Sequence, residues 1–158
     1  MDEVAIVRAL HVVSIVLWIG GVGFVTTVLL PAVRRFKAPN ARIEFFDQIE
    51  QRFAWQARLS TAVAGLTGFY MLYRLDLWDF FRHPAYWWMH AMIAVWLIFS
   101  LMLFIIEPLY LHDGQLARVQ VDPEVAFRLI EWLHRLLLLI SLITVLGAVA
   151  GSHGLSFE

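Results

Sequence analysis

Two of the six histidines stand at matching depths in hydrophobic segments, where an ionisable side chain is costly unless it is used. Counted from Arg8, His11 lies about 5 Å inside its segment, and counted from Tyr86, His90 lies about 6 Å inside, by the helical rise. If these segments run in the same direction, a ring held between them can receive one axial nitrogen from each side. Haem b suits this pattern, because it needs no covalent attachment and no cysteine. We therefore expect His11 and His90 to be haem ligands.

Residues expected near the same depth in the membrane offer groups that suit the rest of a haem pocket. Three arginines can bind the propionate carboxylates: Arg8, Arg74 and Arg82. Three aromatic residues can form flat apolar walls: Trp18, Trp87 and Phe69. His11 and Trp18 share one face of the first helix by their spacing. The alternative for each membrane histidine is a hydrogen bond to a neighbouring helix.

Copper is the main competing cofactor. Met89 and Met92 stand close to His90, and thioethers are soft ligands that suit Cu(I). In a helix, however, residues at i−1 and i+2 point about 100° and 200° away from His90, which favours packing roles for both methionines. A copper site would instead combine His11, His90 and His153, which follows the last hydrophobic segment.

A further polar group occupies the opposite, inner leaflet. His134 lies about 24 Å from the outer end of its segment, so it cannot join His11 around one metal. Glu131 and Arg135 stand at i and i+4, a spacing that permits an ion pair. With Arg128 they form a polar face that conducts protons, holds a quinone head group or is an interfacial turn of snorkelling side chains.

The two remaining histidines fall in connecting segments. His83 stands beside Pro84 on the outer side, and His112 belongs to the inner connection before the last span. We expect both to be exposed polar side chains.

Several chemistries are excluded by composition. The 158 residues include no cysteine, which removes disulfides, iron–sulfur clusters and thiolate zinc sites. The net charge is −1, so the chain offers no polycationic surface and we expect no nucleic-acid partner. The sequence contains no phosphate-binding glycine loop, Ser-His-Asp set or HExxH helix, so hydrolase functions are not expected.

The elements that position these residues must be membrane helices. The chain is 61% hydrophobic and 16% charged, with a mean hydropathy of +0.72. An ordinary soluble domain is about 45–50% apolar and 25% charged. A span takes about 20 residues, so the length fits four spans and their connections. We expect an all-α fold, an integral membrane four-helix bundle that forms a single transmembrane domain over residues 1–158.

The hydrophobic segments predict spans at residues 4–31, 54–74, 85–107 and 124–150. The third ends at Glu107-Pro108, where proline cannot continue the hydrogen-bond ladder. The fourth opens with Asp122 as the N-cap and Pro123 in the first turn. The N-terminus is acidic and shows no cleavage signal, so we expect the first segment to remain as an anchor.

Basic residues indicate the orientation. The connection between the first two spans holds six of the 12 basic residues, namely Arg34, Arg35, Lys37, Arg42, Arg52 and Arg58. By the positive-inside rule this connection is cytoplasmic, which places both termini on the outer, periplasmic side of a cell inner membrane. Residues 40–53 of this connection have a helical amphipathic pattern, so they form an interfacial helix or extend the second span.

Small residues predict where helices approach each other. They stand at helical spacing in the first two spans, as Gly20, Gly21, Gly23, Ser60, Ala64, Gly65 and Gly68. We expect these two spans to touch there, and such faces also permit a homo-oligomer. An aromatic cluster at the outer end of the third span is typical of an interfacial belt and comprises Trp78, Tyr86, Trp87 and Trp88.

Two short motifs resemble families of small membrane proteins. The segment Arg8-Ala9-Leu10-His11, followed by Trp18-Ile19-Gly20-Gly21 and Pro31, resembles the first helix of the CopD-like family and is similar to the opening histidine helix of the HemJ type of protoporphyrinogen oxidase. Trp88-Met89-His90-Ala91 looks like the start of the third helix of the HemJ type. The HemJ resemblance implies a haem b-binding bundle with His11 and His90 near the haem, and the CopD-like resemblance implies copper transport.

Three functions follow as hypotheses. The leading one is a haem b-binding membrane redox protein that transfers electrons near the outer face, with a quinone, a porphyrin-type substrate or a redox partner protein. The second is a copper-handling or transport protein in the lipid bilayer. The third is a cofactor-free membrane subunit or scaffold.

Overall fold

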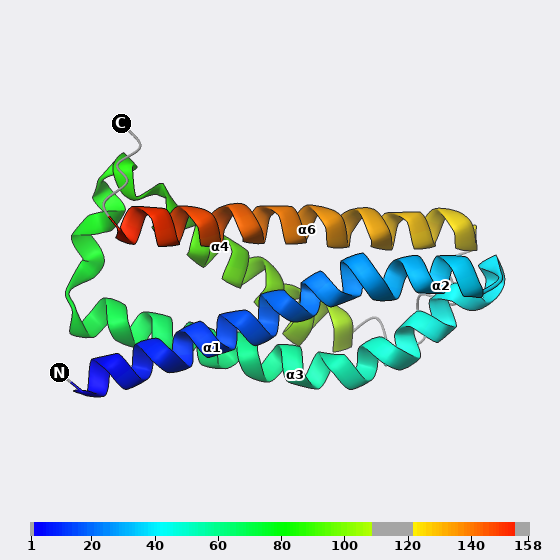
Figure 1. Ribbon diagram of the computed structural model, residues 1–158, viewed down its shortest axis with the longest axis horizontal. Helices are drawn as coiled ribbons and strands as arrows, with labels where there is room; N and C mark the ends of the chain where they lie inside the picture. The colour runs from blue at the N-terminus through cyan, green and yellow to red at the C-terminus, as the bar shows by residue number, and fades with distance from the viewer. Residues whose placement is uncertain (1, 109–121, 154–158) are drawn as a thin grey trace.

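The computed structural model describes residues 2–108 and 122–153, which are almost entirely helical and contain no β-strand. Four long helices, α1 (Asp2–Phe24), α3 (Pro39–Arg74), α4 (Trp87–Leu101) and α6 (Pro123–Ser152), form an elongated bundle (Figure 1). The start of α1, the end of α3 and the end of α6 share one end of the bundle, here called the Glu3 end. The start of α3 and the start of α6 share the other, here called the Arg34 end. The all-α helical bundle predicted from the sequence is confirmed.

Three helical stretches are long and apolar enough to cross a membrane, namely Glu3–Phe36, Pro84–Ile106 and Pro123–Ser152. They correspond to the first, third and fourth predicted spans. Many of their large apolar side chains are exposed, including Val16, Leu97 and Leu146. A soluble monomer rarely exposes so much contiguous apolar surface, so these helices are those of a membrane protein.

The helix α3 is less apolar than the other three and runs unbroken for 36 residues. It joins the amphipathic segment 40–53 to the predicted span 54–74, so the amphipathic segment is an extension of that helix. Its buried face includes Ser60 and Thr61, and charged side chains such as Arg58 interrupt its apolar run. Whether α3 crosses the membrane stays a prediction.

The first helix continues beyond the expected end of its span. After α1 comes the π-helical turn η1 (Val25–Leu29), followed by α2 (Leu30–Phe36). Pro31 lies in the first turn of α2 and has no N–H to donate, and the wider turn before it lets the helix continue. A second π-helical turn, η4 (Met102–Ile106), precedes Glu107-Pro108 at the end of α4.

Local signals set the other helix ends. The Asp122 carboxylate accepts a hydrogen bond from the Glu124 backbone N–H at 2.8 Å, so Asp122 caps α6 as the sequence predicted. Between α3 and α4, the short helices η2 (Leu77–Arg82) and η3 (Pro84–Tyr86) close the turn at the Glu3 end.

The most extensive helix contact joins α1 and α3, as the small residues of the first two spans predicted. A central cluster of buried residues lies where α1, α3 and α4 meet and comprises Trp18, Ile19, Val22, Ala64, Val95 and Phe99. Gly21 makes room for the Phe53 ring, since a Cβ atom there would lie 2.0 Å from it, whereas Gly20 faces open space.

The tryptophans that open α4 pack inside the bundle. Trp87 lies on Gly147 and Trp88 on Gly151, where an added Cβ atom would approach the rings to 2.6 and 2.2 Å. Trp88 is buried, so its expected place in an interfacial belt is corrected: the glycines of α6 leave space that this ring fills. Trp78, by contrast, is exposed.

Candidate functional site

His11 is half-buried on α1 and faces α3. Its Nδ1 atom lies 2.9 Å from the Ala64 carbonyl oxygen and 3.0 Å from the Thr67 hydroxyl oxygen. Because a carbonyl can only accept, Nδ1 carries the hydrogen, while the Thr67 hydroxyl donates to the Val63 carbonyl at 2.6 Å. Gly68 provides the space, since a Cβ atom there would lie 3.1 Å from His11 Cε1. In the neutral form of the His11 ring, this hydrogen bond leaves Nε2 as the nitrogen with the lone pair.

His90 is exposed on α4, and its ring meets the edge of the Phe81 ring with the centroids 5.1 Å apart. These contacts of His90 and those of His11 share no residue. In Figure 1, α4 begins beside the end of α6 and away from the start of α1. Among the residues that the structure describes, no group of three or more histidine or carboxylate side chains is arranged to hold a metal ion. Ligation of one cofactor by His11 and His90 stays a prediction.

The three arginines predicted for propionate binding lie at the Glu3 end but in different settings. Arg8 is exposed on α1. Arg74 pairs with Glu3 at 3.6 Å and so ties the end of α3 to the start of α1. Arg82 pairs with Asp79 at 3.3 Å within η2, and both side chains are exposed. Arg8 and Arg74 thus belong to the helix pair that holds His11, and Arg82 belongs to the turn that contacts His90.

The aromatic residues predicted as pocket walls lie in separate contacts. Trp18 is buried in the central cluster, with its ring edge-on to Phe99 and the centroids 5.0 Å apart. Phe69 contacts Trp96, with centroids 5.4 Å apart. Trp87 of α4 packs its ring against Gly147 of α6. Trp18 also lines a partly open cavity between the helices.

The other histidines predicted near the outer face are exposed. His153 follows α6 as its C-cap residue, and its Nδ1 atom lies 2.8 Å from the Val149 carbonyl oxygen. His83 precedes η3, with its ring centroid 6.4 Å from that of Tyr86. His112 lies outside the described residues.

The methionines near His90 have the packing role that their helical positions favour. Met89 is buried with Leu72 and Trp88, and Met92 packs against the same cluster. They fill space between α3 and α4, which accounts for their presence without a copper ion.

Glu131 is buried on α6, and its partner is Arg34 of α2. Arg34 Nε donates to Glu131 Oε1 at 2.9 Å, and Arg34 Nη2 lies 2.7 Å from Oε2. The pair that the sequence suggested within α6, Glu131 with Arg135, is therefore replaced by this two-point contact. Arg135 and Arg128 are exposed.

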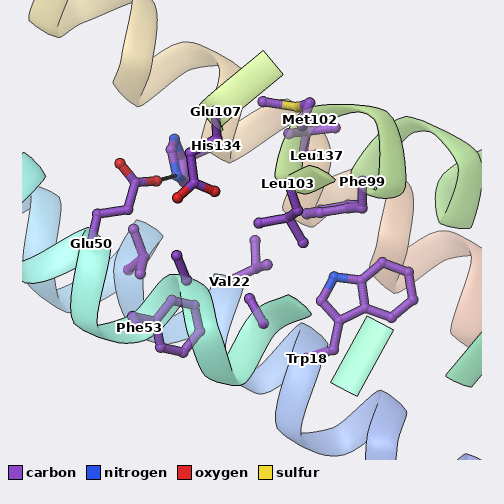
Figure 2. A pocket seen from close by; sticks show the side chains of 13 residues that line it. Trp18, Val22, Glu50, Phe53, Phe99, Met102, Leu103, Glu107, His134 and Leu137 are labelled. Carbon is purple, nitrogen blue, oxygen red and sulfur yellow. Dashed lines mark ion pairs between the residues drawn. The ribbon is translucent and has the colours of Figure 1, made fainter. Parts of the chain in front are cut away.

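A cavity of about 80 Å³ lies between α1, η1, α3, α4, η4 and α6 (Figure 2). One end carries the polar side chains Glu50, Glu107 and His134, and the other end carries Trp18. His134 Nε2 and Glu50 Oε1 are 3.9 Å apart. Apolar side chains, among them Phe53, line the wall between the two ends.

The two carboxyl groups of the cavity are in different electrostatic states. Arg58 Nη2 lies 2.9 Å from Glu107 Oε1, so the Glu107 carboxylate has a cationic partner. Burial raises the pKa of Glu50, which precedes the predicted span 54–74, from 4.5 to about 8, with further contributions from the charges of Glu107 and Asp47. Glu50 is therefore mostly protonated at neutral pH and can donate a hydrogen bond.

Sequence reasoning missed Glu50 and Glu107 as site residues. Glu50 stands with charged neighbours in the amphipathic segment 40–53, which favoured an exposed position. Its spacing from Phe46 and Phe53, at i+4 and i−3, nevertheless places it on the apolar stripe of that helix. A carboxyl group on the buried stripe was the signal that could have identified the cavity.

Comparisons of the chain with protein-family models, with curated proteins and with solved structures find no match. The CopD-like and HemJ-type resemblances therefore stay predictions.

Proposed function

We propose that this membrane protein binds haem b at the Glu3 end of the bundle and transfers electrons there. The observation that carries the proposal is the hydrogen bond from His11 Nδ1 to the Ala64 carbonyl. Metal-ligating histidines almost always donate their second ring nitrogen to a carbonyl, a carboxylate or a water, which fixes the tautomer and orients the ligating nitrogen. His11 has this arrangement, with Nε2 as the nitrogen that remains.

Four residues of the bundle would hold the group. His11 would ligate the iron through Nε2, and His90, exposed on α4, is the candidate for the second ligand. Arg8 and Arg74 would pair with the propionates, since guanidinium groups bind carboxylates in a two-point geometry. When bound, haem b supplies one-electron exchange between the ferric and ferrous states of its iron.

We also propose that the bundle lies in a cell inner membrane with its Glu3 end on the periplasmic side. The support is the concentration of basic residues in the connection 34–58, which by the positive-inside rule stays cytoplasmic. His11 would then serve redox partners that approach from the outer face.

The test is the visible absorption spectrum of the full chain purified from haem-replete cells, with metal analysis of the same sample. We expect a Soret band, and α and β bands that sharpen on addition of dithionite, in proportion to iron content. A colourless protein that contains copper would favour the copper-handling alternative. A colourless protein without metal would favour the subunit or scaffold role, and either result overturns the haem proposal.

A further inference from the structure

The cavity between the helices carries hydrogen-bonding groups at two opposite ends. Figure 2 shows Trp18 at one end and the side chains of Glu50, His134 and Glu107 gathered at the other. A buried water needs about 10–15 Å³ of cavity, so a volume of about 80 Å³ holds several waters, and because the cavity is partly open, a planar ring can occupy it without being fully enclosed. Residues of α1, η1, α3, α4, η4 and α6 line this space.

The indole of Trp18 provides a hydrogen-bond donor without an acceptor. The side chain is only 4% exposed, and Nε1 has no hydrogen-bond partner among the described residues. In Figure 2 this nitrogen lies on the cavity side of the ring. A buried tryptophan N–H usually finds an acceptor. An acceptor atom at this end of the cavity would satisfy it.

At the opposite end, Glu50 and His134 provide one donor and one acceptor. His134 Nδ1 lies 2.9 Å from the Ile130 carbonyl oxygen, so it carries the hydrogen and leaves Nε2 as an acceptor in the neutral ring. Glu50 is mostly protonated at neutral pH because its pKa is about 8. The 3.9 Å between Nε2 and Glu50 Oε1 is too long for a hydrogen bond, so both groups are available to a third partner.

The remaining polar group of this end is already engaged. Glu107 pairs with Arg58, whose Nε also donates to the Leu103 carbonyl at 3.0 Å. Between the two polar ends, Phe53 and Phe99 contribute aromatic surface to the lining. The cavity therefore has an apolar middle, a donor at one end and a donor with an acceptor at the other.

We propose that this cavity binds the head group of a quinone or its quinol, a six-membered ring with oxygen atoms at opposite ends. One oxygen accepts from Trp18 Nε1, and the opposite oxygen lies between Glu50 and His134. A quinone carbonyl accepts the Glu50 hydrogen, whereas a quinol hydroxyl donates to His134 Nε2. Both redox forms therefore find a partner at the same place.

This binding site is distinct from His11 and goes beyond the haem proposal. Quinone binding is tested by titration and haem binding by the absorption spectrum, so the two proposals can fail independently of each other. A water-filled cavity with no ring ligand is the competing outcome.

The test is isothermal titration of the full chain in lipid nanodiscs with the tail-free probe 2,3-dimethoxy-5-methyl-1,4-benzoquinone, with empty nanodiscs titrated to subtract partitioning. We expect saturable binding of one probe per chain. Trp18→Phe removes the N–H donor together with the five-membered ring of the indole and should weaken binding about tenfold, as expected for a buried donor lost from a ligand contact. Trp132→Phe is the control, since Trp132 is exposed on α6. The Trp132→Phe chain should bind the probe as the unmodified chain does.

Variants of Glu50 provide an independent test of quinone binding if Trp18→Phe does not fold. Glu50→Gln keeps a donor and should retain binding, while Glu50→Ala should weaken it about tenfold. Binding to the unmodified chain should also fall as pH rises through about 8, where Glu50 ionises, and Glu50→Gln should remove that dependence. The groups that face Glu50 in this test are Asp47 on its own helix, His134 on α6 and the Glu107–Arg58 pair.

Two outcomes overturn the proposal. One is the absence of saturable binding above the empty nanodiscs, which is the result for a cavity that holds only water. The other is equal affinity in the Glu50→Ala and Glu50→Gln chains at pH 7, or, if Trp18→Phe folds, equal affinity in the Trp18→Phe and Trp132→Phe chains.

Discussion

His11 Nδ1 and the Ala64 carbonyl oxygen lie 2.9 Å apart and join α1 to α3 within the most extensive helix contact of the bundle. The same hydrogen bond has two consequences. It holds the ring with Nε2 free, and it contributes to helix packing. A variant that tests His11 as a ligand must therefore keep a donor for Ala64 while it removes the imidazole.

The Arg34–Glu131 pair is expected to stabilise the Arg34 end of the bundle. Glu131→Ala leaves the guanidinium without its two-point partner and opens space beside α2. Because Arg34 is partly exposed and also lies 3.6 Å from Glu124, we expect a loss of about 2 kcal/mol, below the full cost of breaking a fully buried pair. Thermal unfolding in detergent measures it. Arg135→Ala, at an exposed position of the same helix, should change stability little, and equal losses in the two variants would refute the role of the pair.

Glu50 is expected to make stability fall as pH rises. Its pKa is raised from 4.5 to about 8 in the folded chain, so the folded state binds more protons than the unfolded state between these values. By linkage the free energy of unfolding decreases across this window and then levels off above pH 8. Glu50→Gln removes the ionisation, so its stability relative to the unmodified chain should increase from pH 5 to pH 8. Thermal midpoints of both chains at several pH values measure this, and a constant difference would contradict it.

Gly65 is expected to be required by the Trp96 ring. A Cβ atom at position 65 would lie 2.5 Å from Trp96 Nε1, which donates to the Thr61 carbonyl at 2.9 Å. We expect Gly65→Ala to cost about 1–3 kcal/mol through overpacking and loss of this bond. Gly20→Ala is the matched control, because nothing lies within 4 Å of its Cβ and alanine favours the helix. Chemical denaturation in detergent compares the two, and equal stability would mean that Trp96 can move aside.

The absence of cysteine makes the orientation directly measurable. Asn40→Cys and Ser152→Cys introduce single thiols at opposite ends of the bundle into a chain that has none. In spheroplasts treated with a membrane-impermeant maleimide, we expect Ser152→Cys to be labelled and Asn40→Cys to be labelled only after permeabilisation. The reverse pattern would invert the proposed topology, and labelling of both would argue against the proposed four crossings.

The sequence predicted the helices well because the signals for them are local. Asp122 and Pro123 mark the start of α6 within a few residues, and the apolar runs have the length that a membrane requires. The π-helical turn η1, through which the first helix continues past Pro31, was not predicted. Neither hydropathy nor proline position reports such a turn.

The candidate site was less predictable because its contacts join distant parts of the chain. Matching depth suggested that His11 and His90 meet, which stays a prediction. The hydrogen bond of His11 to Ala64 of α3 could not be predicted from depth, because depth does not report the rotation of a helix. For Glu131, the i+4 spacing suggested Arg135, whereas the fold supplies Arg34 from α2. Glu50 was obscured by charged neighbours, although its place on an apolar stripe was readable.

Haem ligation by His11 is tested most directly by the absorption spectrum of purified His11→Gln beside the unmodified chain and His83→Gln. The glutamine amide keeps a donor for the Ala64 carbonyl but has no imidazole nitrogen, and His83 is an exposed histidine outside the proposed site. We predict that His11→Gln loses the Soret band while it remains folded by circular dichroism, and that His83→Gln retains the band. A folded His11→Gln protein with a full Soret band would contradict the assignment of His11 as a haem ligand.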